Sequence, residues 1–425
     1  MTDLARPGVV ALLVSFAAAS PAPAQHGTSE RRVAADVAFL ASDRLEGRFT
    51  GSAGAREASA HIAEAFRRAG LRPGTSGSWF QEFRVASGAP ALHGTGLGGD
   101  SGLAGRNVVA VLPGRDPALR AEAVVIGAHY DHLGTGTFGA RDSASRGQIH
   151  NGADDNASGT ATLLEIARIL KEKPPRRTIV FVAFAGEELG LIGSDAYVKQ
   201  PAVPIEQTVA MINLDMVGRL RDDRLMALGA ETATELPALL DSLNRSAGFQ
   251  LRASGDGYGA SDHQSFYLAK RPVIHFFTDL HEDYHRPGDD ADKLNVAGMA
   301  RIARFAADLA RVIADRDARL TLVDMPRPTP VAGGGGYGTW LGTIPDMTGG
   351  GPGVRLSGVM PGSPAEAAGI REGDVLIRIG VHEVLDLQAM TNALRAHRPG
   401  DSVAVVVRRG ERLDTLRTVL GRRGR

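Results

Sequence analysis

The stretch GAHYDHLG, residues 127–134, follows the apolar run AEAVVI and places His129, Asp131 and His132 within four positions. The apolar run is typical of a β-strand, and the three side chains after it are of types that bind metal ions or move protons. One strand that ends in polar groups carries little weight by itself. The question is whether other strands of the chain end in the same way.

Apolar strand candidates alternate with amphipathic helix candidates along most of the chain, behind a helix–turn–helix pattern at residues 32–70. This alternation predicts an α/β fold with a mainly parallel, twisted sheet sandwiched by helices. In such a sheet the functional site lies beyond the carboxyl ends of the strands. The expected strands are residues 106–112, 121–128, 177–185, 208–215 and 271–277, and the expected helices include residues 158–173, 235–248 and 297–316.

Composition restricts the chemistry. The 425 residues carry a formal net charge of zero, and 43% of them are hydrophobic, as in an ordinary folded domain. The basic residues are scattered, so we expect no nucleic-acid partner. The chain has no cysteine. Disulfides and thiolate zinc sites are therefore excluded, and any metal must be held by His, Asp and Glu.

The first residues have the pattern of an export signal. A short region with Arg6 precedes an apolar stretch from about Gly8 to Ala19, and Ala22-Pro23-Ala24 forms an A-x-A cleavage site. We expect residues 1–24 to be removed and the mature protein to be periplasmic or secreted. An uncleaved membrane anchor is the alternative, but the apolar stretch is short for a span, and no later stretch reaches that length.

Three further strand candidates also run into ligand-type side chains. The segment 177–185 is followed by Glu187 and Glu188, 208–215 ends in Asp215, and 271–277 precedes a loop with His285. A pair of acids, Asp154 and Asp155, stands just before a helix candidate. Together these groups suit zinc or a similar divalent ion. Their number favours two metals, which need a bridging carboxylate, about two further ligands each and a base that binds neither.

The segments HYDHLG, NGADDNASG, AFAGEELGLIGS, INLDMVG, SDHQSF and YHRPGD, in this order, resemble the zinc aminopeptidases of the M28 family. The resemblance extends over about residues 35–315 and implies a zinc peptidase domain at residues 25–322 with two zinc ions per chain. His129 and Asp215 would bind one ion, Glu188 and His285 the other, and Asp155 would bridge them.

The same resemblance implies three roles in peptide hydrolysis. Glu187 takes the position of the general base, Asp131 would hold the ring of His129, and Tyr284 would donate its hydroxyl to the oxyanion. The substrates would be peptides, and release of N-terminal residues rests on the resemblance alone. The family's side-chain pocket is built by loops, here residues 219–229 and 254–264, so specificity is not readable.

Each assignment has an alternative. Asp154 competes with Asp155 for the bridging position, and Glu187 and Glu188 could exchange roles. Ser261 and Asp262 are expected to shape the pocket wall. Three further histidines are expected to be structural: His132, His263 and His281.

Proline and glycine replace the helical pattern at residues 323–336, which predicts a linker. Residues 337–421 after it resemble a bacterial PDZ domain, most clearly in SPAEAAGIREGDVLIRIG. The resemblance implies that the loop from Trp340 to Thr343 receives a peptide C-terminus, with the peptide added as a strand. Pro345 removes one donor from that edge. A rigid appendage that binds nothing is the alternative.

Two other functions compete with a di-zinc aminopeptidase. One is an acyltransferase resembling glutaminyl cyclases, which use a single zinc; the presence of both His129 and Asp215 argues against it. The other is a scaffold without catalysis that binds peptides through the PDZ domain. Substitution of a ligand residue would favour the scaffold, and the sequence has none.

Overall fold

The computed structural model describes residues 27–85, 102–141, 143–326, 339–345, 353–360, 362–385, 389–390, 393–394 and 396–422. The predicted signal peptide and residues 327–336 of the predicted linker lie outside these ranges. None of the described helices is long and apolar enough to cross a membrane.

Four parallel strands form the centre of the main sheet, in the order β5 (Thr178–Phe184), β4 (Ala123–His129), β6 (Thr208–Leu214) and β9 (Val273–Phe277). Every residue of β4, β5 and β6 is buried. Burial on both faces explains why these strands are continuous apolar runs in the sequence.

The edges of the sheet are mostly antiparallel. On one side β3 (Leu103–Leu112) pairs with β5, and β1 (Arg72–Pro73) and β2 (Phe80–Val85) pair with β3. On the other side β7 (Arg224–Leu228) pairs antiparallel with β9, and β8 (Gln250–Ser254) runs parallel to β7. The predicted α/β fold is confirmed, but among the described strands the sheet as a whole is mixed. The expectation of a loop at residues 219–229 was wrong for β7.

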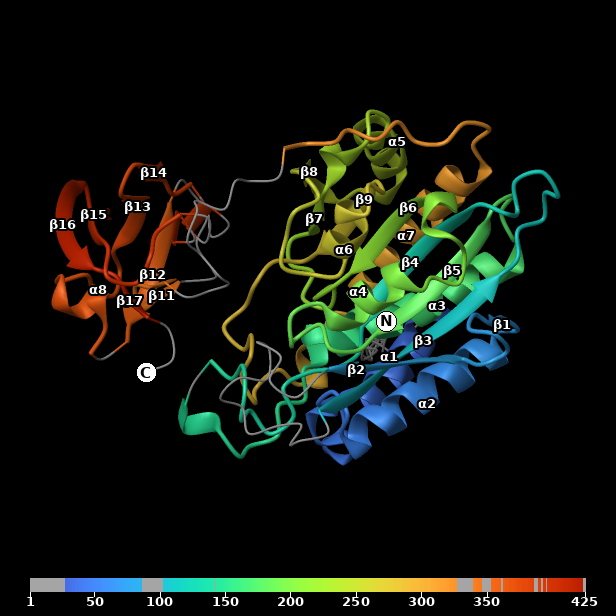
Figure 1. The fold of residues 1–425 in the computed structure, drawn as a ribbon, viewed down its shortest axis with the longest axis horizontal. Coiled ribbons are helices and arrows are strands. Elements are labelled where there is room, and N and C mark those ends of the chain that lie inside the picture. The colour runs from blue at the N-terminus through green and yellow to red at the C-terminus, as the bar shows by residue number, and fades with distance from the viewer. Residues whose placement is uncertain are drawn as a thin grey trace, which may run out of the picture.

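Helices cover both faces of the sheet (Figure 1). Val124 and Ile126 of β4 belong to one apolar cluster and Ala123 and Val125 to another, because successive residues of a strand point to opposite faces. The first cluster includes residues of α1 (Thr28–Leu40), α2 (Ala53–Arg68), α3 (Gly159–Glu172), α5 (Leu236–Ala247) and α7 (Val296–Asp315). The second includes residues of α4 (Ile192–Lys199) and α6 (His263–Leu268).

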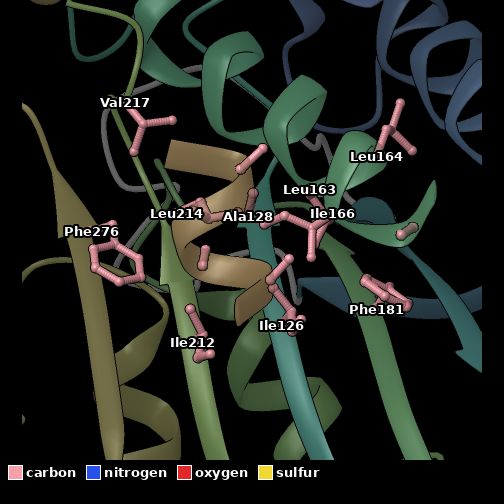
Figure 2. Packing of buried hydrophobic residues seen from close by; sticks show 14 of the residues in the cluster. Ile126, Ala128, Leu163, Leu164, Ile166, Phe181, Ile212, Leu214, Val217 and Phe276 are labelled. Atoms are coloured by element: carbon pink, nitrogen blue, oxygen red, sulfur yellow. The ribbon is translucent and has the colours of Figure 1, made fainter. Parts of the chain in front are cut away.

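Figure 2 shows the first cluster, with Leu163 and Ile166 of α3 near Ile126 and Ala128 of β4. This packing fixes α3 against the parallel strands and so fixes the segment just before it, η5 (Ala153–Ser158). Other short turns of helix are η1 (Asp43–Arg48), η4 (Ser143–Ser145), η6 (Ile205–Gln207), η7 (Ala230–Thr232) and η8 (Ala291–Lys293).

The C-terminal unit is a separate antiparallel sheet in the order β11 (Thr343–Pro345), β12 (Val354–Val359), β13 (Val375–Ile379), β15 (Ser402–Arg409) and β16 (Arg412–Val419), with β14 (His382–Glu383) beside β13 (Figure 1). The strands β10 (Thr339–Trp340) and β17 (Gly421–Arg422) form a second pair, and α8 (Pro364–Ala367) follows β12. Its apolar core is its own and includes Leu341, Leu356 and Leu376.

Candidate metal centre

The candidate ligands lie where the central parallel strands end. His129 is the last residue of β4, Asp215 directly follows β6, and Glu187 and Glu188 stand in the turn after β5. Because these three strands are parallel neighbours, their carboxyl ends meet at one edge of the sheet. His285 reaches the same place from the loop after β9, with a left-handed backbone φ of 57°.

Asp155 lies between two histidines. Its Oδ1 is 3.4 Å from Nε2 of His129, and its Oδ2 is 3.2 Å from Nε2 of His285. Asp154 is turned away, because its Oδ1 accepts a hydrogen bond from the amide of Gly218 at 2.6 Å and its Oδ2 is 3.1 Å from His281. The geometry therefore favours Asp155 over Asp154 as a bridging carboxylate.

The spacing of the donor atoms suits zinc on both sides of Asp155. Zinc–ligand distances near 2.0–2.1 Å put the ligands of a tetrahedral site about 3.3 to 3.5 Å apart. Nε2 of His129 is 3.3 Å from Oδ1 of Asp215, and Nε2 of His285 is 3.3 Å from Oε2 of Glu188. With the two distances to Asp155, the histidine nitrogen in each half of the site lies at about this spacing from two carboxylate oxygens.

His132 is also close to the second half of the site. Its Nδ1 is 2.7 Å from Oε1 of Glu188 and 3.9 Å from Oδ2 of Asp155, so these three residues form a second possible ligand set. The 2.7 Å distance is that of a hydrogen bond rather than of two ligands of one ion. We therefore assign His132 to holding Glu188, a contact that the sequence prediction of a structural histidine did not identify.

The site is charged and buried, and its groups perturb one another. Burial lowers the pKa of His129, but the charges of Asp215 and Glu187 outweigh burial and raise it well above the usual value. Burial also lowers the pKa of His285, but Glu188 and Asp155 outweigh burial and raise this pKa well above the usual value. Burial acts to raise the pKa of Glu188, yet His285 and His132 bring it down to about 2. A buried group of carboxylates and imidazoles of this kind matches the donor chemistry of divalent cations.

Glu187 differs from the other carboxylates. Its Oε2 is 4.0 Å from Nε2 of His129, farther than the nearest oxygens of Asp155 and Asp215. Burial raises its pKa well above the usual value, the charge of His129 opposes this, and Glu188 and Asp215 raise it further. A carboxylate beside the ligands with a raised pKa is suited to accept a proton.

The carboxylate of Asp131 makes different contacts from those expected. It lies 3.7 Å from Nδ1 of His129, whereas the main-chain carbonyl of Asp131 is 3.2 Å from that nitrogen. Oδ1 of Asp131 accepts the amide of Glu187 at 3.3 Å, and Oδ2 accepts the hydroxyl of Thr50 at 2.7 Å. The role of Asp131 in orienting His129 stays a prediction, and its contact with the Glu187 backbone is an addition.

Tyr284 stacks on the ring of His285, with ring centroids 3.9 Å apart and an angle of 26° between the planes. Burial and the charges of Asp155 and Glu188 raise the pKa of its hydroxyl well above the usual value. The hydroxyl thus remains protonated and can act as a donor.

Asp289 was not identified as a functional residue from the sequence, although it lies in the YHRPGD segment. Its Oδ2 accepts the amides of Asp154 and Asp155 at 2.9 and 3.0 Å, and its Oδ1 is 3.1 Å from Arg219. It therefore fixes the backbone of the candidate bridging residue. Ser261, expected in the pocket wall, donates to Oδ2 of Asp215 at 2.8 Å.

Sequence comparisons match two regions of the chain. Residues 107–310 match peptidase family M28, and residues 339–420 match the PDZ domain. The uncharacterized protein YfbL of Escherichia coli is 30% identical over 231 residues, 46% of this chain and 68% of that protein. A probable leucine aminopeptidase of Arthroderma otae is 31% identical over 49% of this chain and 57% of that protein. Aminopeptidase YwaD of Bacillus subtilis is 30% identical, and the match spans only 37% of its length.

Solved structures share the fold of the larger unit. BSAP, a zinc aminopeptidase from Bacillus subtilis, has a TM-score of 0.53 at 17% identity and covers 67% of this chain and 94% of its own. A glutaminyl cyclase of Bacteroides thetaiotaomicron has a TM-score of 0.52 at 17% identity, over 67% of this chain and 96% of its own. At this identity the likeness shows the fold alone. An aminopeptidase and a glutaminyl cyclase share that fold, so the fold does not distinguish between the two activities.

Proposed function

Since the chain belongs to peptidase family M28 and carries a C-terminal PDZ domain, we propose that it is a di-zinc aminopeptidase that releases N-terminal residues from peptides. The observation that carries this proposal is the position of Asp155 between His129 and His285. One shared carboxylate with a separate histidine and a separate acid on each side is the donor set of a two-metal site.

Two zinc ions held by His129, Asp155, Glu188, Asp215 and His285 would polarise the scissile carbonyl and lower the pKa of the attacking water. Glu187 takes the proton from that water and delivers it to the leaving amine. Tyr284 donates its hydroxyl to the carbonyl oxygen as negative charge develops there. Asp131 and His132 keep Glu187 and Glu188 in place through the contacts described above.

The PDZ domain is proposed to bind the C-terminus of a peptide or protein at residues 340–343, or to limit access to the metal centre. The edge strand β11 pairs with β12, and its register shifts between Ile344 and Pro345. A proline at such an irregularity shortens the edge available for strand addition. The peptide would therefore be held mainly by contacts of its terminal carboxylate with residues 340–343.

Residues 1–24 are proposed to direct export and to be removed, so that the mature enzyme acts in the periplasm or outside the cell. N-terminal sequencing of the purified mature chain tests this, and a start at residue 25 is expected. A mature chain that begins at Met1 would contradict it.

A glutaminyl-cyclase-type acyltransferase is the second candidate, because a cyclase shares the fold. The test is zinc content by elemental analysis, together with hydrolysis of a panel of aminoacyl chromogenic amides before and after chelation. Two zinc ions and chelator-sensitive release of the free amino acid are expected. One ion, no amide cleavage and cyclisation of an N-terminal glutamine would favour the cyclase instead.

A further inference from the structure

The segment Asp43–Thr50, which we call the N-terminal brace, precedes the family match at residues 107–310 and yet contacts three loops of the candidate metal centre. It includes η1 and adopts left-handed backbone angles at Glu46, Gly47 and Arg48. A run of such angles is costly for side-chain-bearing residues and is kept where surrounding contacts determine it.

Arg48 is fully buried and gives its guanidinium to main-chain carbonyls. Nε donates to Tyr130 at 2.8 Å, Nη1 donates to Asn151 at 2.6 Å and also to Leu40, and Nη2 donates to Gly152 at 2.9 Å. Tyr130 stands between His129 and Asp131, and Gly152 precedes η5. One planar side chain thus ties the loop after β4 to the segment that carries Asp155.

Main-chain contacts strengthen the same junction. The amide of His132 donates to the carbonyl of Arg48 at 3.4 Å, and the amide of Gly134 donates to Gly47 at 3.0 Å. Asp43 accepts a hydrogen bond from the side chain of Asn151 at 2.7 Å. Gly47 has a φ of 68°, and a Cβ there would lie 2.5 Å from the carbonyl oxygen of Gly134, so no larger residue fits.

Thr50 joins the third loop. Its hydroxyl donates to Oδ2 of Asp131 at 2.7 Å and accepts the amide of Gly186 at 3.0 Å, while Oδ1 of Asp131 accepts the amide of Glu187. Thr50 is 1% exposed, so water does not replace these bonds. The hydroxyl therefore connects the loop after β4 directly to the turn that carries the candidate base.

We propose that the N-terminal brace is a positioning element of the metal centre, in which Arg48 sets the loops of His129 and Asp155 and Thr50 sets Asp131 and the Glu187 turn. The proposal rests on the proposed function. Outer groups that hold ligands and bases in place usually contribute about 10- to 100-fold to metal affinity or activity.

The experiment compares Thr50→Val with Thr50→Ser in the full mature chain. Valine keeps the volume and removes both hydrogen bonds, whereas serine keeps the hydroxyl. Thr178→Val is the matched control, because the buried Thr178 hydroxyl also donates one hydrogen bond, to the carbonyl of Arg120 at 2.8 Å, and accepts one, from the amide of Gly114 at 3.1 Å. Thr178 begins β5, at the opposite end from the Glu187 turn. The measurements are zinc affinity by competition with a chelating dye, kcat and KM on an aminoacyl amide, and the melting temperature.

We expect Thr50→Val to lower kcat or zinc affinity about 10- to 100-fold with KM changed less than about threefold. Thr50→Ser should restore most of the loss, and the melting temperature of Thr50→Val should fall by about as much as that of Thr178→Val, because each change removes one donated and one accepted hydrogen bond. Wild-type kcat and zinc affinity in Thr50→Val, or an equal loss of either in Thr178→Val, would overturn the proposal.

The outcomes separate the two proposals. If the wild type binds zinc but cleaves no amide, the proposed function fails. The zinc affinities of the variants then test by themselves whether the N-terminal brace positions the metal centre. If the wild type binds no zinc, both fail. Arg48→Lys tests the other arm, because an ammonium cannot span carbonyls from three segments. A folded Arg48→Lys chain with unchanged zinc affinity would contradict the positioning role of Arg48. If this chain does not fold, the comparison of Thr50→Val with Thr50→Ser decides the proposal.

Discussion

In the PDZ domain, the carboxylate of Asp374 is 1% exposed and is held by Arg409 through two hydrogen bonds of 2.7 Å. At the metal centre, five carboxylates gather around His129 and His285, and the buried Arg48 nearby gives its hydrogen bonds to carbonyls. The first arrangement neutralises its buried charge with the protein's own side chains. The second leaves an excess of negative charge that cations would balance. Dependence on metal should therefore be confined to one of the two domains. The carboxylates compared at the metal centre are Asp131, Asp155, Glu187, Glu188 and Asp215.

The largest effect should come from the acid that binds no metal. Glu187→Gln is expected to lower kcat/KM about 10²- to 10⁴-fold, because the amide cannot take up a proton, while two zinc ions remain. Zinc analysis and amide hydrolysis measure both quantities. The exposed Glu231→Gln serves as the control. Activity within a few-fold of wild type in Glu187→Gln would contradict the assignment.

Glu188→Gln sharpens the contrast between the adjacent acids. It is expected to lose activity together with one of the two zinc ions, because it removes a charged ligand that His285 and His132 contact. Elemental analysis of both variants decides which of the two acids binds zinc. If Glu187→Gln loses zinc and Glu188→Gln keeps it, the two residues have exchanged roles.

Chelation should affect one domain only. The chain has two tryptophans, of which Trp79 lies in the peptidase domain and Trp340 in the PDZ domain. Each zinc ion at about 100 times its dissociation constant contributes about 2.7 kcal/mol, which corresponds to a shift of about 5 to 10 °C per ion. Fluorescence melts of Trp340→Phe, which reports Trp79, should show this shift on chelation. Melts of Trp79→Phe, which report Trp340, should not change on chelation. An equal shift in these melts would contradict the confinement of metal dependence to the peptidase domain.

The PDZ acid should respond to pH instead of metal. Burial acts to raise the pKa of Asp374, but its bonds to Arg409 bring it below the usual value. Such a group stabilises the folded state above its unfolded pKa of about 3.9, and the stabilisation is lost as pH falls through the lower folded pKa. Asp374→Asn should cost about 1 to 3 kcal/mol at pH 7. Its Trp340 melt should then depend less on pH below about 4 than that of wild type.

The smallest effect is expected from removing the PDZ domain. A chain ending at Val331 should cleave a single aminoacyl amide within about twofold of wild type, because the described ligand set lies wholly in the larger domain. Cleavage of long peptides is expected to fall if their C-termini bind the PDZ domain. If the truncated chain cleaves both the amide and long peptides at the wild-type rate, the PDZ domain does not recruit substrates.

The sequence predicted the parts of the fold whose environment is uniform. The strands β4, β5 and β6 are buried at every position, so an apolar run marks each of them. In contrast, β8 is the edge strand on its side of the sheet and most of its residues are exposed, while β7 beside it is only partly buried. Their strand character depends on neighbours that no local pattern reveals.

The same limit applies to the site. Strand ends indicate which acids and histidines lie together, because parallel strands place them at one edge. The direction of each side chain depends on partners elsewhere in the chain. His132 turns toward Glu188, which is 56 residues away, and Arg48 reaches a carbonyl 104 residues away. No spacing rule connects residues so distant.

These separations also determine when the centre can form during synthesis. The N-terminal brace emerges from the ribosome about a hundred residues before Asn151 and Gly152, the carbonyls that Arg48 binds. The bond between His285 and Gly139 spans 146 residues. Contacts of such long range form late in folding, because loop closure must precede them. A nascent chain therefore lacks the complete two-metal ligand set until His285 has been made, near the end of the domain, so hydrolytic activity would begin only with the finished fold.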